Sequence, residues 1–244
     1  MAGRRNFGRR RRFRKVSGAR QRTRHRCTWR KGIDMDAMEC LFTRRSVRRF
    51  HPDPVPEKAL EQMLRAAAYA PSAKNTQSWR FVVLRDKARD GIIDLLEERA
   101  RDLEGRIHSA AGSVRAMREA PLLITVHNTG ALVRMMRVAK DRGGAEGDRE
   151  RVRSLLREAE IQGVSAAIQN MLLAAHALGL GGLWIGDVHY AREEIESALS
   201  AHCPHPLVAA VALGYPAQKP RQPERNPARV TVTLEALEPD GSNQ

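Results

Sequence analysis

The stretch TRRSVRRF (43–50) concentrates side chains that are suited to binding a phosphate group. Arg44, Arg45, Arg48 and Arg49 surround Ser46, which is more positive charge than the end of a short helix needs. Guanidinium groups make bidentate, charge-assisted hydrogen bonds to phosphate oxygens, and a hydroxyl adds a further donor. The residue types of this stretch therefore suit a phosphate monoester.

The stretch PSAKNTQSWRF (71–81) carries a second set of ligand-type side chains. Ser72, Asn75 and Gln77 follow Pro71, between an alanine-rich apolar segment and the apolar run FVVL. A plain connector needs only one or two turn residues, whereas this one holds a row of hydrogen-bonding groups. We interpret it as a surface that contacts a polar, flat ligand.

A third group of basic residues follows the apolar run LVAAVALG (207–214). In QKPRQPER, Lys219 and Arg221 stand a few residues after that run. Each basic cluster, taken alone, is typical of solvated charge. Together with the loop at 71–78, the two clusters form a more specific pattern.

Other chemistries lack the residues that they need. The glycines of GLGGLWIG (179–186) follow a long helix pattern, whereas a dinucleotide-binding turn follows a strand. In HCPH (202–205) the donors are close together around a proline, and no second cluster completes a zinc site. His176 is more consistent with a packed histidine than with a catalytic base, and no Ser-His-Asp grouping is visible. We predict no metal site and assign no side chain as certainly catalytic.

The elements that must position these groups can be read from apolar spacing and from proline. A short helix begins after Asp36 as its cap, 46–56 is extended because of its prolines, and Pro56 opens a helix that Pro71 ends. We predict further helices at 86–119, 160–178 and 191–201, and strands at 81–84, 121–128, 207–214 and 229–235. We interpret GGLWIGDV (181–188) as loop and turn. Residues 131–158 predict a flexible excursion and then a helix, either a solvated surface loop or a lid over a site. Mixed helices and strands without regular βαβ alternation favour an α+β layered domain.

The net charge of +15 belongs to one end of the chain. Residues 1–34 hold 14 of the 43 basic residues and one of the 28 acidic residues, so they carry +13 and residues 35–244 carry +2. The segment lacks the aliphatic residues of a core, and we expect a disordered basic tail. It could bind RNA, DNA or another polyanion, or act in targeting. We favour a third interpretation, in which translation starts at Met35 or Met38, so that nucleic acid is a partner only if the tail is native.

Cysteine spacing and hydropathy indicate the compartment. Cys27, Cys40 and Cys203 are far apart, with no CxxC pair, which favours a reducing cytosol. No apolar run approaches the ~20 residues that span a bilayer. We therefore expect a cytoplasmic protein that makes no membrane contact.

Four motifs in order carry a resemblance to a known family. RRSVRRF, PSAKNTQSW, GLGGLWIGD and ALGYP followed by KPR closely resemble the nitroreductase family of FMN-dependent oxidoreductases, over roughly residues 38–225. The resemblance implies a nitroreductase-like FMN-binding domain at 35–244, with a mixed, mainly antiparallel sheet wrapped by helices. It also implies an intertwined homodimer, in which the apolar helix 160–178 lies in the dimer core and strand 229–235 crosses to the partner.

The resemblance further implies an FMN site at the dimer interface, with residues from both subunits. Its phosphate and ribityl ligands would be Arg44, Arg45, Ser46 and Arg221, and Arg48 and Lys219 would hold positive charge near the pyrimidine edge of the flavin. The ring would be lined by Pro71, Ser72, Asn75 and Gln77 and approached from the far side by Ile185 and Gly186. Ser78 stands where the family usually has Pro, and we expect a slightly looser loop there.

The activity that the resemblance implies is a two-step transfer of electrons. NADH or NADPH would deliver hydride to the flavin and leave, and an electron-poor acceptor such as a nitroaromatic or a quinone would then take the electrons at the same place (ping-pong). Relatives with flavin-fragmenting or dehalogenating chemistry offer an alternative on the same fold. A flavin-binding protein without turnover, and a polyanion-binding protein that acts through residues 1–34, also remain open.

Overall fold

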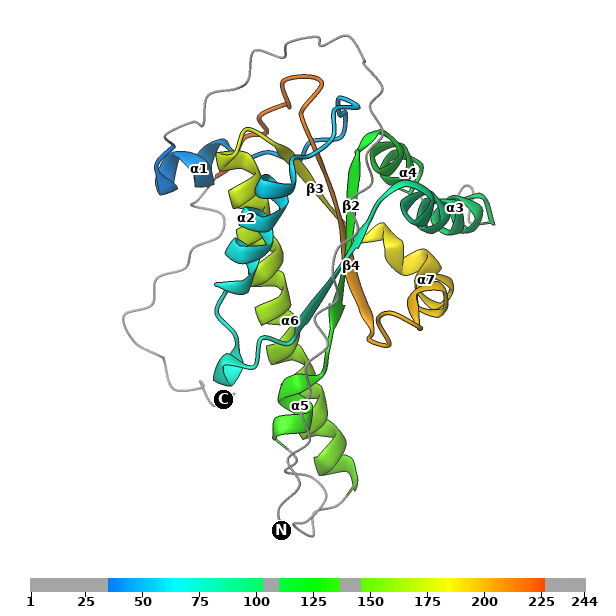
Figure 1. Cartoon of the computed structure of the whole chain (residues 1–244). Helices are drawn as coiled ribbons and strands as arrows, with labels where there is room; N and C mark the ends of the chain where they lie inside the picture. The colour runs from blue at the N-terminus through cyan, green and yellow to red at the C-terminus, as the bar shows by residue number, and fades with distance from the viewer. Residues whose placement is uncertain (1–34, 103–109, 137–145, 227–244) are drawn as a thin grey trace, which may run out of the picture. The chain divides into compact units, whose positions relative to one another are not determined.

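The computed structural model describes residues 35–102, 110–136 and 146–226, all within a single unit, Lys31–Gln244. The predicted basic tail (1–34), the predicted strand 229–235 and the middle of the glycine-rich stretch lie outside the described residues. Figure 1 shows how the described helices and strands are arranged.

A four-stranded antiparallel sheet forms the centre of the fold. Its order is β1-β2-β4-β3, made of β1 (Trp79–Leu84), β2 (Leu122–Asn128), β4 (Leu207–Gly214) and β3 (Gly181–Ile185). A short parallel bridge joins Ser46 to Gly182 at the β3 edge, so the sheet is mixed but mainly antiparallel. The predicted mixed, mainly antiparallel sheet of an α+β fold is thereby confirmed.

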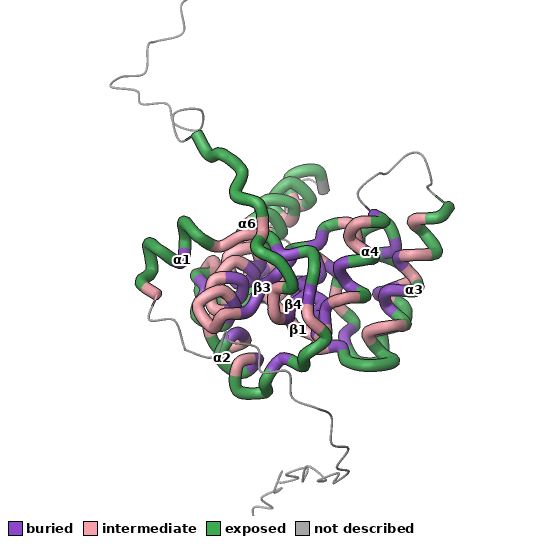
Figure 2. Tube along the Cα trace, turned by 90° about the horizontal axis from the view of Figure 1, so that it is seen from above, coloured by how far each residue is buried: buried purple, intermediate pink, exposed green. Residues whose placement is uncertain are grey.

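Helices cover both faces of this sheet (Figure 1). The helices α2 (Glu57–Ala68) and α6 (Glu146–Ala177) lie on one face, and α3 (Asp86–Asp102), α4 (Ala110–Glu119) and α7 (Arg192–Leu199) lie on the other. Strand β2 is buried along its whole length, and its side chains alternate between the faces. Leu123 packs with the α3 side and Leu122 and Ile124 with the α6 side. Figure 2 shows the buried residues gathered between the layers.

The short elements sit at the ends of these layers. They are α1 (Ala37–Thr43), the 3₁₀ turn η1 (Ala73–Asn75), α5 (Ala131–Met135) and the 3₁₀ turn η2 (Asp187–Ala191). The predicted cap of α1 is confirmed, because the Asp36 carboxylate accepts the Glu39 N–H at 2.9 Å. Among the described residues, no helix combines the length and the apolar character that crossing a membrane requires.

Three predicted elements differ from the structure. The stretch 181–185 is strand β3 rather than loop, and its glycines serve close packing: a Cβ on Gly181 would lie 2.5 Å from Val47 Cγ2. The predicted helix 86–119 is two helices, α3 and α4, on either side of residues that the structure does not describe. The charged helix after residue 145 and the apolar helix 160–178 are one continuous helix, α6, of 32 residues.

Candidate functional site

The arginine segment, residues 44–51, is held between β3 and the chain that leaves β4. The Val47 N–H donates to Gly182 O at 3.1 Å, and the His51 N–H donates to Tyr215 O at 2.9 Å. The Ala217 N–H donates to Arg49 O at 2.9 Å. These bonds bring together two of the three predicted ligand segments, 44–48 and 219–221, which are far apart in the sequence.

A cavity of about 590 Å³, the cationic pocket, opens where these two segments meet. Its lining contains three predicted ligands and no acidic residue: Ser46, Val47, Arg48, Arg49, Gln218, Pro220, Arg221, Gln222 and Pro223. Glu119 neutralises Arg49, with Arg49 Nε 2.8 Å from the carboxylate. The side chains of Arg48 and Arg221 make no hydrogen bond or ion pair with the residues that the structure describes, so their charges are available to an anion.

Arg44 and Arg45 extend the positive charge beside this pocket. Burial, and then repulsion from Arg45 and Arg225, lowers the pKa of Arg44. Arg45 Nη1 donates to Phe42 O and to Arg44 O, both at 2.7 Å. Its Nε is buried and has no hydrogen-bond partner within the described part of the chain. Two adjacent guanidinium groups and a buried N–H donor without a partner are the groups that a bound phosphate would satisfy.

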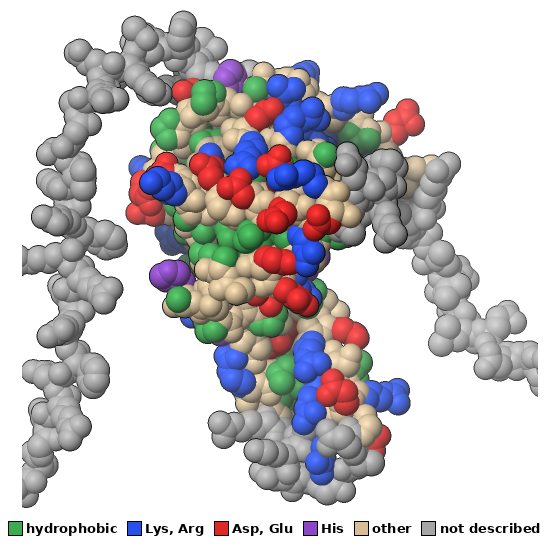
Figure 3. Space-filling view, turned by 90° about the vertical axis from the view of Figure 1, so that its right-hand side faces the viewer, with side chains coloured by type: hydrophobic (Ala, Val, Ile, Leu, Met, Phe, Trp, Pro, Cys, Tyr) green, Lys and Arg blue, Asp and Glu red, His purple; other side chains and the backbone are tan. Residues whose placement is uncertain are grey.

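Opposite charges are mixed on another face of the molecule. Figure 3 faces the side that carries α3, α4 and α7, where basic and acidic side chains are interspersed. Arg118 pairs there with Asp94 and Glu97, and Arg99 Nη2 lies 2.5 Å from Glu194. The unpaired arginines of the cationic pocket are therefore distinct from an ordinary solvated charged face.

The loop 71–78 has an unusual backbone. Lys74, Asn75 and Gln77 have φ values of 55°, 53° and 48°, in the left-handed region that costs a residue with a side chain roughly 1–3 kcal/mol. Side chains within the loop support this shape: Ser72 Oγ accepts the Gln77 N–H at 3.0 Å, and Asn75 Oδ1 accepts from Gln77 Nε2 at 3.2 Å. Pro71, Asn75 and Gln77 are exposed, so the predicted ring ligands are accessible. Clustered strain of this kind is typical of binding sites.

Ser78, at the end of this loop, does not loosen it as we expected. The Ser78 hydroxyl is buried, lies 3.0 Å from Thr76 Oγ1 and donates to the Glu160 carboxylate at 3.3 Å. The hydroxyl therefore ties the loop to α6, which a proline side chain could not do.

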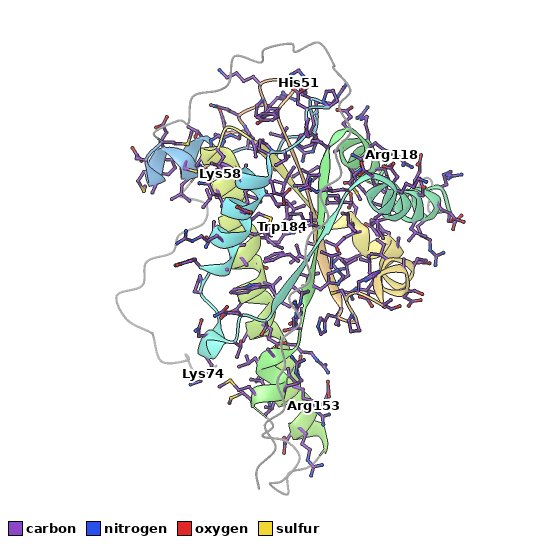
Figure 4. The ribbon with its side chains drawn as sticks, in the orientation of Figure 1. His51, Lys58, Lys74, Arg118, Arg153 and Trp184 are labelled. Atoms are coloured by element: carbon purple, nitrogen blue, oxygen red, sulfur yellow. The ribbon has the colours of Figure 1, made fainter. Side chains whose placement is uncertain are left out.

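The loop contacts the middle of α6, whereas Thr43, which directly precedes the arginine segment, contacts the last turn of that helix. A Cβ on Gly163 would lie 3.2 Å from Ser72 Cβ, while thirteen residues later His176 Nε2 lies 2.8 Å from Thr43 Oγ1. At 1.5 Å of helix rise per residue these points are ~20 Å apart. In Figure 4, His51 of the arginine segment and Lys74 of the loop are labelled far apart in the fold. A single chain therefore brings two of the three predicted segments together and leaves the third ~20 Å away along α6.

The remaining predicted ligands differ in accessibility. Ile185 is 2% exposed and packs in the core, so only its backbone is available to a ligand. Gly186 opens η2, and a Cβ there would meet no atom within 4 Å. Lys219 is exposed and is not among the residues that line the cationic pocket.

Two residues of the site were missed from the sequence. Arg225 lies at the end of QKPRQPER, where the count of basic residues was the available signal. Glu160 is a single acid at the start of an apolar helix stretch, and its burial, at 3% exposure, is the signal that a sequence does not give.

The layered α+β arrangement is the nitroreductase fold, as its similarity to a solved structure of that kind shows. The chain belongs to the nitroreductase family, whose profile it matches over residues 41–215. The prediction of a nitroreductase-family oxidoreductase is thereby confirmed.

Individual relatives give the range of this similarity. The chain is 32% identical to an NADH dehydrogenase of Thermus thermophilus, over 81% of this chain and 95% of that protein. It is 30% identical to a 5,6-dimethylbenzimidazole synthase of Rhodospirillum rubrum, over 78% and 86% of the two chains. A Desulfovibrio desulfuricans protein solved in complex with FMN is 28% identical, with a TM-score of 0.59 over 82% of this chain and 97% of that one.

Proposed function

We propose that this protein is an FMN-dependent oxidoreductase that passes hydride from NADH or NADPH, by way of the flavin, to an electron-poor acceptor such as a nitroaromatic or a quinone. The observation that carries the proposal is the cationic pocket, where Ser46, Arg48 and Arg221 from distant parts of the chain meet in a lining that contains no acidic residue. Family membership supplies the chemical class.

The proposed ligands in and beside the pocket divide into two tasks. Arg44, Arg45, Ser46 and Arg221 hold the FMN phosphate and ribityl chain, because guanidinium groups and a hydroxyl match phosphate oxygens. Arg48, with Lys219, places positive charge toward the pyrimidine edge of the ring. Negative charge gathers at that edge on reduction, so a fixed cation there favours reduction. Bound FMN supplies hydride acceptance and electron transfer, and this chain binds, orients and tunes it.

We propose that the site is shared between two copies of the chain. Asn75 and Gln77 lie ~20 Å along α6 from the arginine segment of their own chain, so the loop of a second copy completes the ring site. Helix α1 supports this arrangement, since it exposes a contiguous apolar set: Met38 at 56%, Leu41 at 48% and Phe42 at 67%. Apolar side chains exposed together on one helix mark an association surface.

The test is the absorption spectrum of the purified protein, followed by anaerobic titration with NADH and with NADPH. We expect one tightly bound FMN per chain, bleached by one of the two nucleotides and reoxidised by a quinone or a nitroaromatic. A monomer that does not bind added FMN would refute the proposal.

A second candidate is supported by the similarity to the Rhodospirillum rubrum synthase. In that case this site would hold reduced FMN and fragment it, instead of passing its electrons to a separate acceptor. Mass spectrometry of the reduced, FMN-loaded protein after exposure to oxygen distinguishes the two. Appearance of 5,6-dimethylbenzimidazole identifies the second activity, and unchanged FMN identifies the first.

A further inference from the structure

Helix α6 contains a buried carboxylate to which the proposed function gives no role. Glu160 is 3% exposed, and within the described ranges it is the only acidic residue that is buried. Burying a charged group is costly unless several hydrogen bonds compensate it, so its surroundings indicate what the chain uses it for.

All of the hydrogen bonds to the Glu160 carboxylate are ones in which it accepts. Oε1 accepts the Leu132 N–H at 2.7 Å, the Val133 N–H at 3.3 Å and the Ser78 hydroxyl at 3.3 Å. Oε2 accepts from Asn128 Nδ2 at 3.0 Å. A carboxylate that only accepts suits the ionised form. Glu160 thus joins α6 to three segments: the loop 71–78, the end of β2 and the first turn of α5.

The bond to Ser78 fixes the end of the strained loop. Ser78 directly follows Gln77, whose φ is 48°. The Ser78 carbonyl also accepts the Thr129 N–H at 3.0 Å, so Ser78 is held from two sides. At the other end of the loop, Ser72 lies against Gly163 of the same helix. Helix α6 therefore contacts both ends of the loop, at Ser72 and at Ser78. Asn75 and Gln77 lie between these two contacts.

We propose that Glu160 is a positioning residue for the flavin: through Ser78 it holds the loop 71–78 in the left-handed backbone that presents the Asn75 and Gln77 amides to the ring. The inference rests on the proposed function. It is particular to this chain, because a hydroxyl at position 78 is what reaches the carboxylate. Glu160 Oε1 also accepts the Leu132 N–H in the first turn of α5. A displacement of α5 would therefore move Glu160 and, through it, the loop.

Glu160→Gln tests the proposal with little change in volume. The amide oxygen can keep the bonds from Leu132 and Ser78, but the new NH₂ group faces Asn128 Nδ2, donor against donor. Asn128 cannot turn over without losing the bond from the Gly130 N–H to its Oδ1, at 3.0 Å. The side chain must shift, and the bond to Ser78, the longest to Oε1 together with that from Val133, is lost first.

The experiment measures the FMN dissociation constant by flavin fluorescence and the visible circular dichroism of the bound flavin. We expect Glu160→Gln to weaken FMN binding about tenfold or more, which corresponds to the loss of one hydrogen bond to a charged group, and to change the dichroism of the flavin. Ser78→Ala should give a similar change. The double variant should bind FMN no more weakly than either single variant, because both substitutions remove the same hydrogen bond between residues 78 and 160.

Glu196→Gln is the matched control. Glu196 lies on α7, on the other face of the sheet, and its Oε1 accepts the Leu207 N–H at 2.7 Å, as Glu160 accepts that of Leu132. We expect a loss of thermal stability without a change in FMN binding. Should both glutamine variants lose FMN in equal proportion to stability, Glu160 is merely structural and the proposal is overturned.

The remaining outcomes are also decisive. If Glu160→Gln binds FMN as tightly as the parent, the inference is overturned while the proposed function stays intact. The same holds if the double variant weakens FMN binding by the product of the two single-variant factors. A parental protein that binds no FMN overturns both. If Glu160→Gln does not fold, Ser78→Ala alone decides, because it deletes a single hydroxyl; unchanged affinity and dichroism in that variant then overturn the inference.

Discussion

Substituting Gly181 by Ala tests how the arginine segment is held in place. A Cβ at this position would lie 2.5 Å from Val47 Cγ2 and 2.8 Å from Val47 Cβ, against an optimal carbon–carbon separation of about 3.5–4.0 Å. A change of rotamer cannot relieve the second contact, because Val47 Cβ is fixed by the backbone, and the Val47 N–H is bound to Gly182 O. The backbone of the arginine segment must move, and Ser46 and Arg48 move with it.

The expected loss is about 1–3 kcal/mol of unfolding free energy, the usual cost of overpacking a filled site. For a domain of this size each kcal/mol lowers Tm by about 2–4 °C. FMN binding should weaken as well, since the cationic pocket is displaced. Thermal unfolding of the protein without flavin, and an FMN titration, measure the two effects separately.

A control and a rescue make this prediction sharp. Gly91 lies in α3 with no atom within 4 Å of an added Cβ, so Gly91→Ala should leave stability equal or raise it by up to about 1 kcal/mol. Val47→Ala removes both Cγ atoms, and the double variant with Gly181→Ala should lose less than the sum of the single losses. Full additivity, or an unchanged Tm in Gly181→Ala, would refute the reasoning.

Further predictions concern the pocket and the buried histidine. Arg48→Glu should weaken FMN binding by at least tenfold and slow reduction by NADH or NADPH, since it reverses an unpaired charge in the pocket; unchanged flavin retention and turnover contradict this assignment. Arg49→Ala is its control and should bind FMN more nearly as the parent does, because Glu119 already pairs with Arg49. Burial lowers the pKa of His127, which is bonded to His205 O and Thr125 Oγ1. The unfolded chain therefore takes up the proton first as pH falls, so stability should be full above the ordinary histidine pKa of about 6.5 and decline below it. The check is the difference in Tm between pH 7 and pH 5, which should be smaller in His127→Gln than in the parent. An equal difference in the two proteins counts against the prediction.

Local rules predicted the elements whose identity depends on local chemistry. The Asp36 cap, the extended segment around Pro52 and Pro54, and strand β4 at 207–214 agree with the structure. Each is determined by a side chain or an apolar run within a few residues. Strand β3 was missed because Gly181 and Gly182 favour a turn when only the sequence is considered. Their reason lies elsewhere in the chain, in Val47 and Leu172, which approach too closely for any side chain.

The same distinction holds for the candidate site. Residue types pointed to Ser46, Arg48 and Arg221, and the structure brings those three together in one pocket. The separation of the loop 71–78 from that pocket could not be predicted from its residues, since it depends on the length of α6 between the two contacts. Glu160 was missed for a related reason: only the packing of α5 and the loop against α6 makes it a buried acceptor.

If the site is shared between two copies, as we propose, α6 is the element that sets its geometry. The helix contacts the loop near Gly163 and the start of the arginine segment near His176. A two-fold axis perpendicular to α6 and midway between these contacts, near Asn170, would bring the loop of one copy to the arginine segment of the other. Because a two-fold contact pairs each residue reciprocally, such a dimer contains two equivalent sites and the isolated chain contains none. Ligand that binds only the dimer stabilises it by mass action. FMN binding and dimerisation must then strengthen each other, and a change that separates the α6 helices must release both flavins even when every ligand residue is intact.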